Sequence, residues 1–157
     1  MTTKAFQDFY SEQTAHCYGC GRLNPLGHQL KSYWAEDGET SIARFTPQPE
    51  HTAIPGFVYG GLLASLIDCH GTGTAAAAAY KHAGREMGTP PEFRYVTGAL
   101  NVSYRRPTPL GPELILRGTV REIKPRKVVV DIELIAEGNV CVLGEVIAVQ
   151  MPEKMVK

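Results

Sequence analysis

Hydrophobic and polar residues alternate with the two-residue period of β-strands over much of the chain. In residues 127–137, branched aliphatic side chains at the even positions from 128 to 134 alternate with acidic side chains at 131 and 133. Such alternation is typical of a strand with one buried and one exposed face. The same reasoning predicts strands over residues 28–35, 40–46, 93–104, 113–123, 127–137 and 140–150. The last of these is nearly all apolar, so we expect it inside the sheet.

The segment 62–83 follows a different pattern. It is rich in leucine and alanine, which are strong helix formers, and it begins directly after the Gly60-Gly61 pair. Apolar residues lie on nearly every side of it, as in a helix that is buried on all faces. Because two strands precede this helix and four follow it, we predict an α+β fold. One long central helix is wrapped by a single curved antiparallel sheet of five to six strands.

The first 27 residues are expected to form a segment that packs on the main domain of residues 28–157. Residues 1–15 are predicted as a short amphipathic helix, with Phe6, Phe9 and Tyr10 on its apolar side. A loop rich in glycine and cysteine follows over residues 16–27.

Within that loop, Cys17-x-x-Cys20 is compatible with a metal knuckle, a redox pair or plain loop packing. Structural zinc sites use four ligands, and a redox pair normally opens a helix after a strand. The other cysteines, Cys69 and Cys141, lie in the predicted helix and in a predicted strand. We therefore favour loop packing and expect neither a metal nor a cofactor.

Composition changes this picture little. The chain has 157 residues, 43% of them apolar, which suits one globular domain. Its 16 basic and 16 acidic side chains give no net charge, which argues against attraction of the whole molecule to nucleic acid or to a membrane. The first ten residues lack the apolar run of a secretion signal, so we expect a cytoplasmic protein with reduced thiols.

The charge is nevertheless divided unevenly along the chain. Residues 105–127 hold seven basic and two acidic side chains, and the rest of the chain carries the compensating negative charge. Two interpretations stay open: a solvated strand face, or a local surface for an anionic small molecule, because Arg and Lys suit phosphate.

The richest chemical signal is the glycine pair together with one acid. Gly60 and Gly61 leave the first backbone N–H groups of the helix unobstructed, and those groups can polarise a carbonyl. Asp68 is the acid inside an otherwise apolar helix, where burial of a carboxylate is costly. The alternatives are a tight turn for the glycines and a solvent-facing or structural role for the acid.

Helix geometry separates these two features. Eight residues at about 1.5 Å per residue put Gly60 and Asp68 ~12 Å apart along the axis. One carbonyl cannot contact both within one chain. Two antiparallel copies of the helix would bring the glycine end of one to the Asp68 of the other. If both act in one reaction, the protein is a homodimer or a larger homo-oligomer.

Three phrases of the sequence resemble one known family. Tyr59-Gly60-Gly61 with Asp68 resembles its His-Gly-Gly motif, which an acid follows eight residues after the first glycine. The strand phrase 100–107 with Gly111, and the loop phrase 17–27, are similar as well. These motifs resemble hotdog-fold acyl-CoA thioesterases of the PaaI-like type, within the thioesterase (4HBT) superfamily.

That resemblance implies a hydrolysis mechanism and a set of residue roles. The thioester carbonyl of a coenzyme A ester would bind at Gly60 or Gly61. Asp68 of the partner subunit would activate water or attack directly, and Thr72, one helical turn later, would assist or merely cap locally. Further substrate contacts are expected from the following residues: Tyr59, His51, Asn101, Ser103, Arg106, Arg126 and Lys127.

The chain departs from the family motif at Tyr59, where a histidine is usual. The side chain can donate a hydrogen bond or narrow the acyl pocket. The competing interpretation of the whole chain is a non-catalytic hotdog protein that binds acyl-CoA or an acyl ligand, because a fold alone does not decide function.

Overall fold

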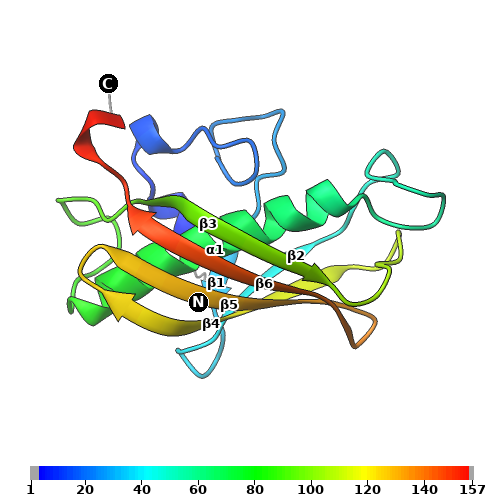
Figure 1. Cartoon of the computed structure of the whole chain (residues 1–157). Helices are drawn as coiled ribbons and strands as arrows, with labels where there is room; N and C mark the ends of the chain where they lie inside the picture. Colours follow the sequence, from blue (N-terminus) through cyan, green and yellow to red (C-terminus); the bar gives the residue numbers. More distant parts are fainter. Residues whose placement is uncertain (1–3, 156–157) are drawn as a thin grey trace.

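Helix α1 (Gly60–His82) is the axis of the structure, and the sheet curves around it (Figure 1). The computed structural model describes residues 4–155. Six strands form the sheet: β1 (Ser32–Trp34), β2 (Ser41–Phe45), β3 (Tyr95–Tyr104), β4 (Leu114–Lys124), β5 (Lys127–Ala136) and β6 (Asn139–Gln150). The α+β prediction of one helix and one antiparallel sheet is confirmed.

The strands are ordered β1-β2-β4-β5-β6-β3, and every neighbouring pair is antiparallel. Strand β6 lies between β5 and β3, so the expectation that the apolar 140–150 segment is internal is confirmed. Strands β1 and β3 form the two edges. Because β3 is a long edge, a row of its backbone groups is left for another chain or for solvent.

Small side chains let the helix and the sheet approach closely. A Cβ added at Gly71 would lie 2.4 Å from the Val146 side chain, and one added at Gly144 would lie 2.4 Å from Ile67. The run 71–80 of the helix is buried throughout. The predicted burial of the helix on all sides is therefore confirmed along this stretch. Within residues 4–155, no helix has the length and hydrophobicity needed to cross a membrane.

A series of hydrogen-bonded polar side chains, called the polar chain below, crosses the otherwise apolar interface between α1 and the sheet. His70 is fully buried, with Nδ1 2.8 Å from Ser32 Oγ and Nε2 3.0 Å from Ser41 Oγ. Thr74 donates to Ser41 Oγ at 2.7 Å, and the Gln7 amide donates to Ser32 Oγ at 3.0 Å. Burial lowers the pKa of His70 to about 4, so the ring is neutral at pH 7. Both ring nitrogens of this buried histidine thus have a hydrogen-bond partner.

The predicted N-terminal α-helix is wrong. The segment instead forms two short 3-10 helices, η1 (Phe6–Phe9) and η2 (Glu12–Thr14). Ala5, Phe6 and Gln7 are buried in succession, which one face of an amphipathic helix cannot achieve. In Figure 1, residues 5–15 lie beside α1, and η1 contacts that helix. A third short 3-10 helix, η3 (Glu153–Met155), follows β6.

Candidate active site

The carboxylate of Asp68 lies half-buried on the side of α1 that faces the start of edge strand β3. The hydroxyl of Thr97, on β3, donates a hydrogen bond to its Oδ1. Burial raises the pKa of the Asp68 carboxyl, the Thr97 hydrogen bond lowers it, and the nearby Cys17 raises it; the net shift is upward. The acid is therefore neither freely solvated nor neutralised by a cation, and it retains basic character.

A β-bulge sets the position of Thr97. The pairing of β3 with β6 shifts register between Thr97 and Ala99, with Gly98 as the extra residue. Thr97 therefore faces α1 on one side of the bulge, and Leu100 and Tyr104 face it on the other. A bulge of this kind re-aims side chains within a strand.

The second half of the site is the N-terminus of α1. The N–H groups of Leu62 and Leu63 bond to the Tyr59 carbonyl, whereas Gly60 and Gly61 begin the helix with N–H groups that have no intrahelical acceptor. Tyr104 Oη donates to the Gly60 carbonyl at 2.7 Å, so β3 also fixes this end of the helix.

The tyrosine that replaces the usual histidine folds back over the glycine pair. A Cβ added at Gly61 would lie 2.5 Å from the Tyr59 ring, so glycine is needed here for the ring to take this position. The Tyr59 side chain is 58% exposed. It therefore forms part of the surface beside the helix N-terminus instead of filling the core.

His51 supports this end of the helix from the preceding loop. Its carbonyl accepts the Tyr59 N–H at 2.9 Å, and its Nδ1 accepts the Gln48 N–H at 2.8 Å. The ring packs against His28 and Phe45, with centroids 5.2 and 5.9 Å away. The contacts of His51 thus hold the loop in place.

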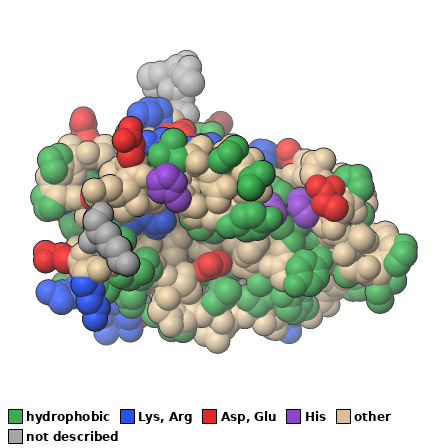
Figure 2. Space-filling model, turned by 90° about the horizontal axis from the view of Figure 1, so that it is seen from above, with side chains coloured by type: hydrophobic (Ala, Val, Ile, Leu, Met, Phe, Trp, Pro, Cys, Tyr) green, Lys and Arg blue, Asp and Glu red, His purple; other side chains and the backbone are tan. Residues whose placement is uncertain are grey.

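An open groove of about 470 Å³ runs beside the glycine end of α1. Its walls are mainly apolar and include Ile54, Phe57, Leu63 and Tyr104, and Arg106 lies at its rim. Figure 2 shows this side of the molecule from above, with hydrophobic side chains gathered toward the end that carries the 47–59 loop and acidic atoms in a hollow near the middle. The groove combines an apolar wall with basic charge.

Three of the predicted site residues point elsewhere. The Thr72 hydroxyl bonds to the backbone carbonyls of Asp68 and Cys69, both at 3.3 Å, and does not contact the carboxylate. Asn101 pairs with Glu145 across the sheet and donates to its Oε1 at 2.7 Å. Asn101 and Ser103 therefore lie on the face of the sheet away from α1, since the intervening positions of β3 face the helix.

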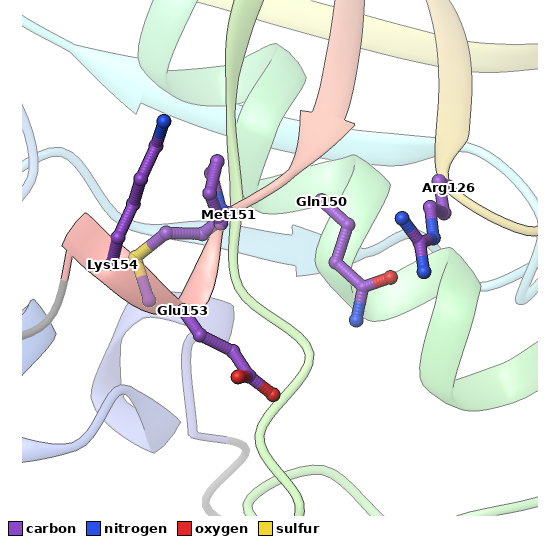
Figure 3. A pocket seen from close by; sticks show the side chains of 6 residues that line it. Arg126, Gln150, Met151, Glu153 and Lys154 are labelled. Carbon is purple, nitrogen blue, oxygen red and sulfur yellow. The ribbon is translucent and has the colours of Figure 1, made fainter.

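Arg126 and Lys127 lie in the β4–β5 turn, beside the end of β6. Arg126 lines a pocket of about 550 Å³ together with Gln150, Met151 and Lys154 (Figure 3). In the sheet, this turn is level with the start of β3, whereas Arg106 follows its end. One chain therefore does not bring together the basic residues predicted to receive coenzyme A.

Ion pairs offset much of the basic charge of residues 105–127. Arg121 pairs with Asp131 and Glu145, and Lys124 pairs with Glu122, which also lies 3.9 Å from Lys127. Within residues 4–155, Arg105 and Arg106 form no ion pair. Arg117 and Arg126 also form no ion pair among these residues, so the groove beside α1 holds two of the four unpaired arginines of this stretch.

Comparison with known proteins identifies the family to which this fold belongs. The sequence matches the thioesterase superfamily over residues 55–143, more than half of its length. The chain belongs to the thioesterase superfamily. Two curated relatives, the acyl-coenzyme A thioesterases THEM4 of Xenopus laevis and Mus musculus, are 30% and 27% identical over 103 and 105 residues. Those stretches cover 66% and 67% of this chain but 40% of each relative, so it spans well under half the length of the curated relatives that it matches.

Solved structures of the superfamily give the same fold. A thioesterase superfamily protein of Shewanella loihica PV-4 has a TM-score of 0.71 and 51% identity, covering 93% of this chain and 99% of that protein. The E. coli PaaI protein from the phenylacetic acid degradation operon has a TM-score of 0.57 at 19% identity, covering 72% of this chain and 73% of that protein. The second likeness shows the hotdog fold alone.

Two residues of this superfamily member could not be found from the sequence. Thr97 and Tyr104 contact Asp68 and Gly60, from which they are separated by 29 and 44 positions. The sequence of a strand does not indicate which helix residue each of its side chains faces. The glycine pair and Asp68, by contrast, are local features and lie on the helix as predicted.

Proposed function

We propose that the protein is an acyl-CoA thioesterase of the PaaI-like branch, with Asp68 as its reacting carboxylate. The observation that carries the proposal is the setting of Asp68: half-buried, with a raised pKa, and held by the Thr97 hydroxyl at a sheet edge. A carboxylate in such a setting suits a general base or a nucleophile. Membership of the thioesterase superfamily supports the reaction class.

The proposed active unit is a homodimer in which two β3 edges pair antiparallel. Such pairing would set the Thr97 end of one β3 beside the Tyr104 end of the other. Because Thr97 contacts Asp68 and Tyr104 contacts Gly60, each Asp68 would approach the glycine helix end of its partner. The long exposed edge of β3 and the half-exposed Tyr104 support this arrangement.

In the proposed reaction, the N–H groups at Gly60 or Gly61 bind the thioester oxygen and stabilise the negative charge that develops on it. Asp68 of the partner subunit either takes a proton from an attacking water or attacks the carbonyl carbon itself. The C–S bond then breaks, and the coenzyme A thiolate leaves and takes up a proton. The direct attack forms an anhydride that water must cleave.

Labelled water separates the two routes. In a single turnover in H₂¹⁸O, a general base places ¹⁸O in the released acid. If Asp68 is the nucleophile and water cleaves the anhydride at the Asp68 carbonyl carbon, an unlabelled Asp68 oxygen passes to the acid and ¹⁸O stays in the side chain, where mass spectrometry of the peptide finds it.

The proposed substrate position follows the groove beside α1. Its apolar wall would hold the acyl group, and Arg105 and Arg106 would meet the phosphates of coenzyme A. In the proposed dimer, the β4–β5 turn of the partner subunit, with Arg126 and Lys127, would lie near the end of the groove that holds Arg105 and Arg106. Tyr59 would border the acyl group.

Thiol release from short-chain, long-chain and aryl-CoA esters tests the activity. We expect turnover of at least one class, and a loss on the order of 100-fold or more in Asp68→Asn, the typical contribution of a positioned acid or base. Glu133→Gln is the matched control, because this exposed acid lies on strand β5 and not on α1. Saturable binding of the esters with no hydrolysis would favour the non-catalytic binding protein instead.

Complementation tests the shared site. Asp68→Asn and Gly61→Val, the latter displacing the Tyr59 ring, should each be inactive. After mixing, exchange of subunits should restore about a quarter of the wild-type activity, because half of the dimers then hold one intact site of two. No recovery despite proven subunit exchange would place the whole site within one chain.

A further inference from the structure

Three cysteines from distant parts of the chain meet beside α1. Cys17 and Cys20 come from the N-terminal loop, and Cys69 comes from the helix. Their sulfur atoms all lie within 4.8 Å of one another, and the Cys17 and Cys69 sulfurs are 3.8 Å apart. The fourth cysteine, Cys141, lies on β6 outside this group. We call the group of Cys17, Cys20 and Cys69 the thiol cluster.

The loop backbone is shaped around the thiol cluster. The Gly21 N–H closes the turn by donating to the Cys17 carbonyl at 2.7 Å. A Cβ added at Gly19 would lie 2.3 Å from Cys69 Sγ, so the loop rests directly on that sulfur.

A cationic side chain lies close to the thiol cluster. The positive charge of Arg94 acts on Cys20, and its guanidinium packs 4.1 Å above the Tyr10 ring. Within residues 4–155, the buried Tyr10 hydroxyl has no hydrogen-bond partner, although it faces the same side of α1, near Gly73. Thiolates are the form in which cysteine binds metals.

We propose that the thiol cluster is a three-thiolate site for a soft cation, Zn²⁺ or Cu⁺, which joins the N-terminal loop to α1. Tetrahedral coordination with Zn–S bonds of about 2.3 Å needs sulfurs ~3.8 Å apart, so small side-chain movements suffice. Sulfur ligands select these ions over Mg²⁺ and Ca²⁺. Binding replaces thiol protons, which pass to solvent.

Position in the chain gives such a site a second effect. Cys69 follows Asp68 directly, so a cation at the thiol cluster would tether the turn of α1 that holds the carboxylate. The proposal does not depend on thioesterase activity, because its tests measure cation binding. It differs from the sequence-based expectation of plain loop packing in one respect: the fold supplies Cys69 as a third sulfur.

Metal titration of the reduced full chain under anaerobic conditions tests the proposal. Co²⁺, a spectroscopic substitute for Zn²⁺, should give thiolate-to-cobalt charge-transfer absorption at one ion per chain, and Zn²⁺ should remove it. A competition with a Cu⁺ chelator forms the second arm. Binding should be lost in Cys17→Ser and kept in Cys141→Ser, the matched control. Circular dichroism checks that each variant is folded.

Alkylation gives a readout that needs no variant. Cys17 is exposed, so iodoacetamide should modify it in the metal-free protein, and bound cation should prevent this. The site is supported if either ion binds and this binding is lost in Cys17→Ser, or if the bound ion protects Cys17 from alkylation. The proposal is overturned if neither ion binds, if binding is unchanged in Cys17→Ser, or if the anaerobically isolated protein holds a disulfide within the thiol cluster.

Discussion

Replacing Thr97 by valine removes one hydroxyl from the proposed active site and little else. Valine keeps the branched shape that suits a strand, and Thr97 is exposed, so the fold has no buried polar group to lose. What disappears is the hydrogen bond to Asp68 Oδ1. Thr97 is a positioning residue in this scheme, because it acts through the carboxylate.

A hydrogen bond to a charged group contributes about 1.5–3 kcal/mol, and solvent reaches this half-buried pair, so the lower value applies. Each 1.36 kcal/mol corresponds to a factor of about ten in rate. We therefore expect kcat to fall ~10-fold in Thr97→Val. The free energy of unfolding should change by less than about 1 kcal/mol, as for most surface substitutions.

Steady-state thiol release on the best substrate, with urea unfolding of the same samples, measures both quantities. Thr97→Ser keeps the hydroxyl and should restore most of the loss in kcat, while KM stays near the wild-type value in both variants. Wild-type kcat in Thr97→Val would refute the positioning role. Equal loss in the serine variant would assign the effect to packing.

Three further predictions concern stability and assembly. Gly71→Ala should lower the free energy of unfolding by ~1–3 kcal/mol in urea, because its Cβ would meet the Val146 side chain at 2.4 Å; an unchanged midpoint contradicts the close packing. Burial raises the pKa of Asp8, but Lys31, 2.7 Å away, and a backbone N–H outweigh it, so the native pKa is lowered. The stabilisation that the ionised Asp8 gives to the fold is therefore fully present above the pKa of Asp8 in the unfolded chain. It is lost as the pH falls through the lower pKa that Asp8 has in the native protein. Asp8→Asn should lower the free energy of unfolding by up to ~1 kcal/mol at pH 7 and leave it unchanged in acid. A difference between wild type and variant that persists in acid would exclude the ion pair as its cause. Leu100→Lys, on the β3 edge, should increase the monomer fraction in sedimentation and lower activity in parallel; an active monomer would refute the shared site.

The sequence predicts the main elements because their signals are local. Period-two alternation and an alanine-rich run specify β5 and α1 whatever surrounds them. The contacts of the candidate site are not local, since Thr97 meets Asp68 across 29 positions. The thiol cluster shows the same limit: Cys69 lies 52 positions from Cys17, and no spacing rule for a loop motif includes it.

The prediction of an α-helix in the N-terminal segment is wrong for a related reason. Its aromatic residues match a helical face, yet the Gln7 side chain is held by Ser32, whose backbone N–H donates to Gln7 Oε1 at 2.8 Å. A tertiary contact of this kind outweighs a weak local preference for helix.

The polar chain through His70 also determines how α1 is phased within the sheet. From residue 71 to 80 the helix presents mostly small side chains on every side, which give little shape against sliding or turning. A slip of one residue would turn the helix by about 100° and remove His70 from Ser32 and Ser41. Leaving such buried groups unpartnered costs about 1–3 kcal/mol each. Asp68 precedes His70 by two residues on the same helix. The hydrogen bonds that hold the imidazole in the core therefore also fix the direction in which the carboxylate faces, toward the sheet edge.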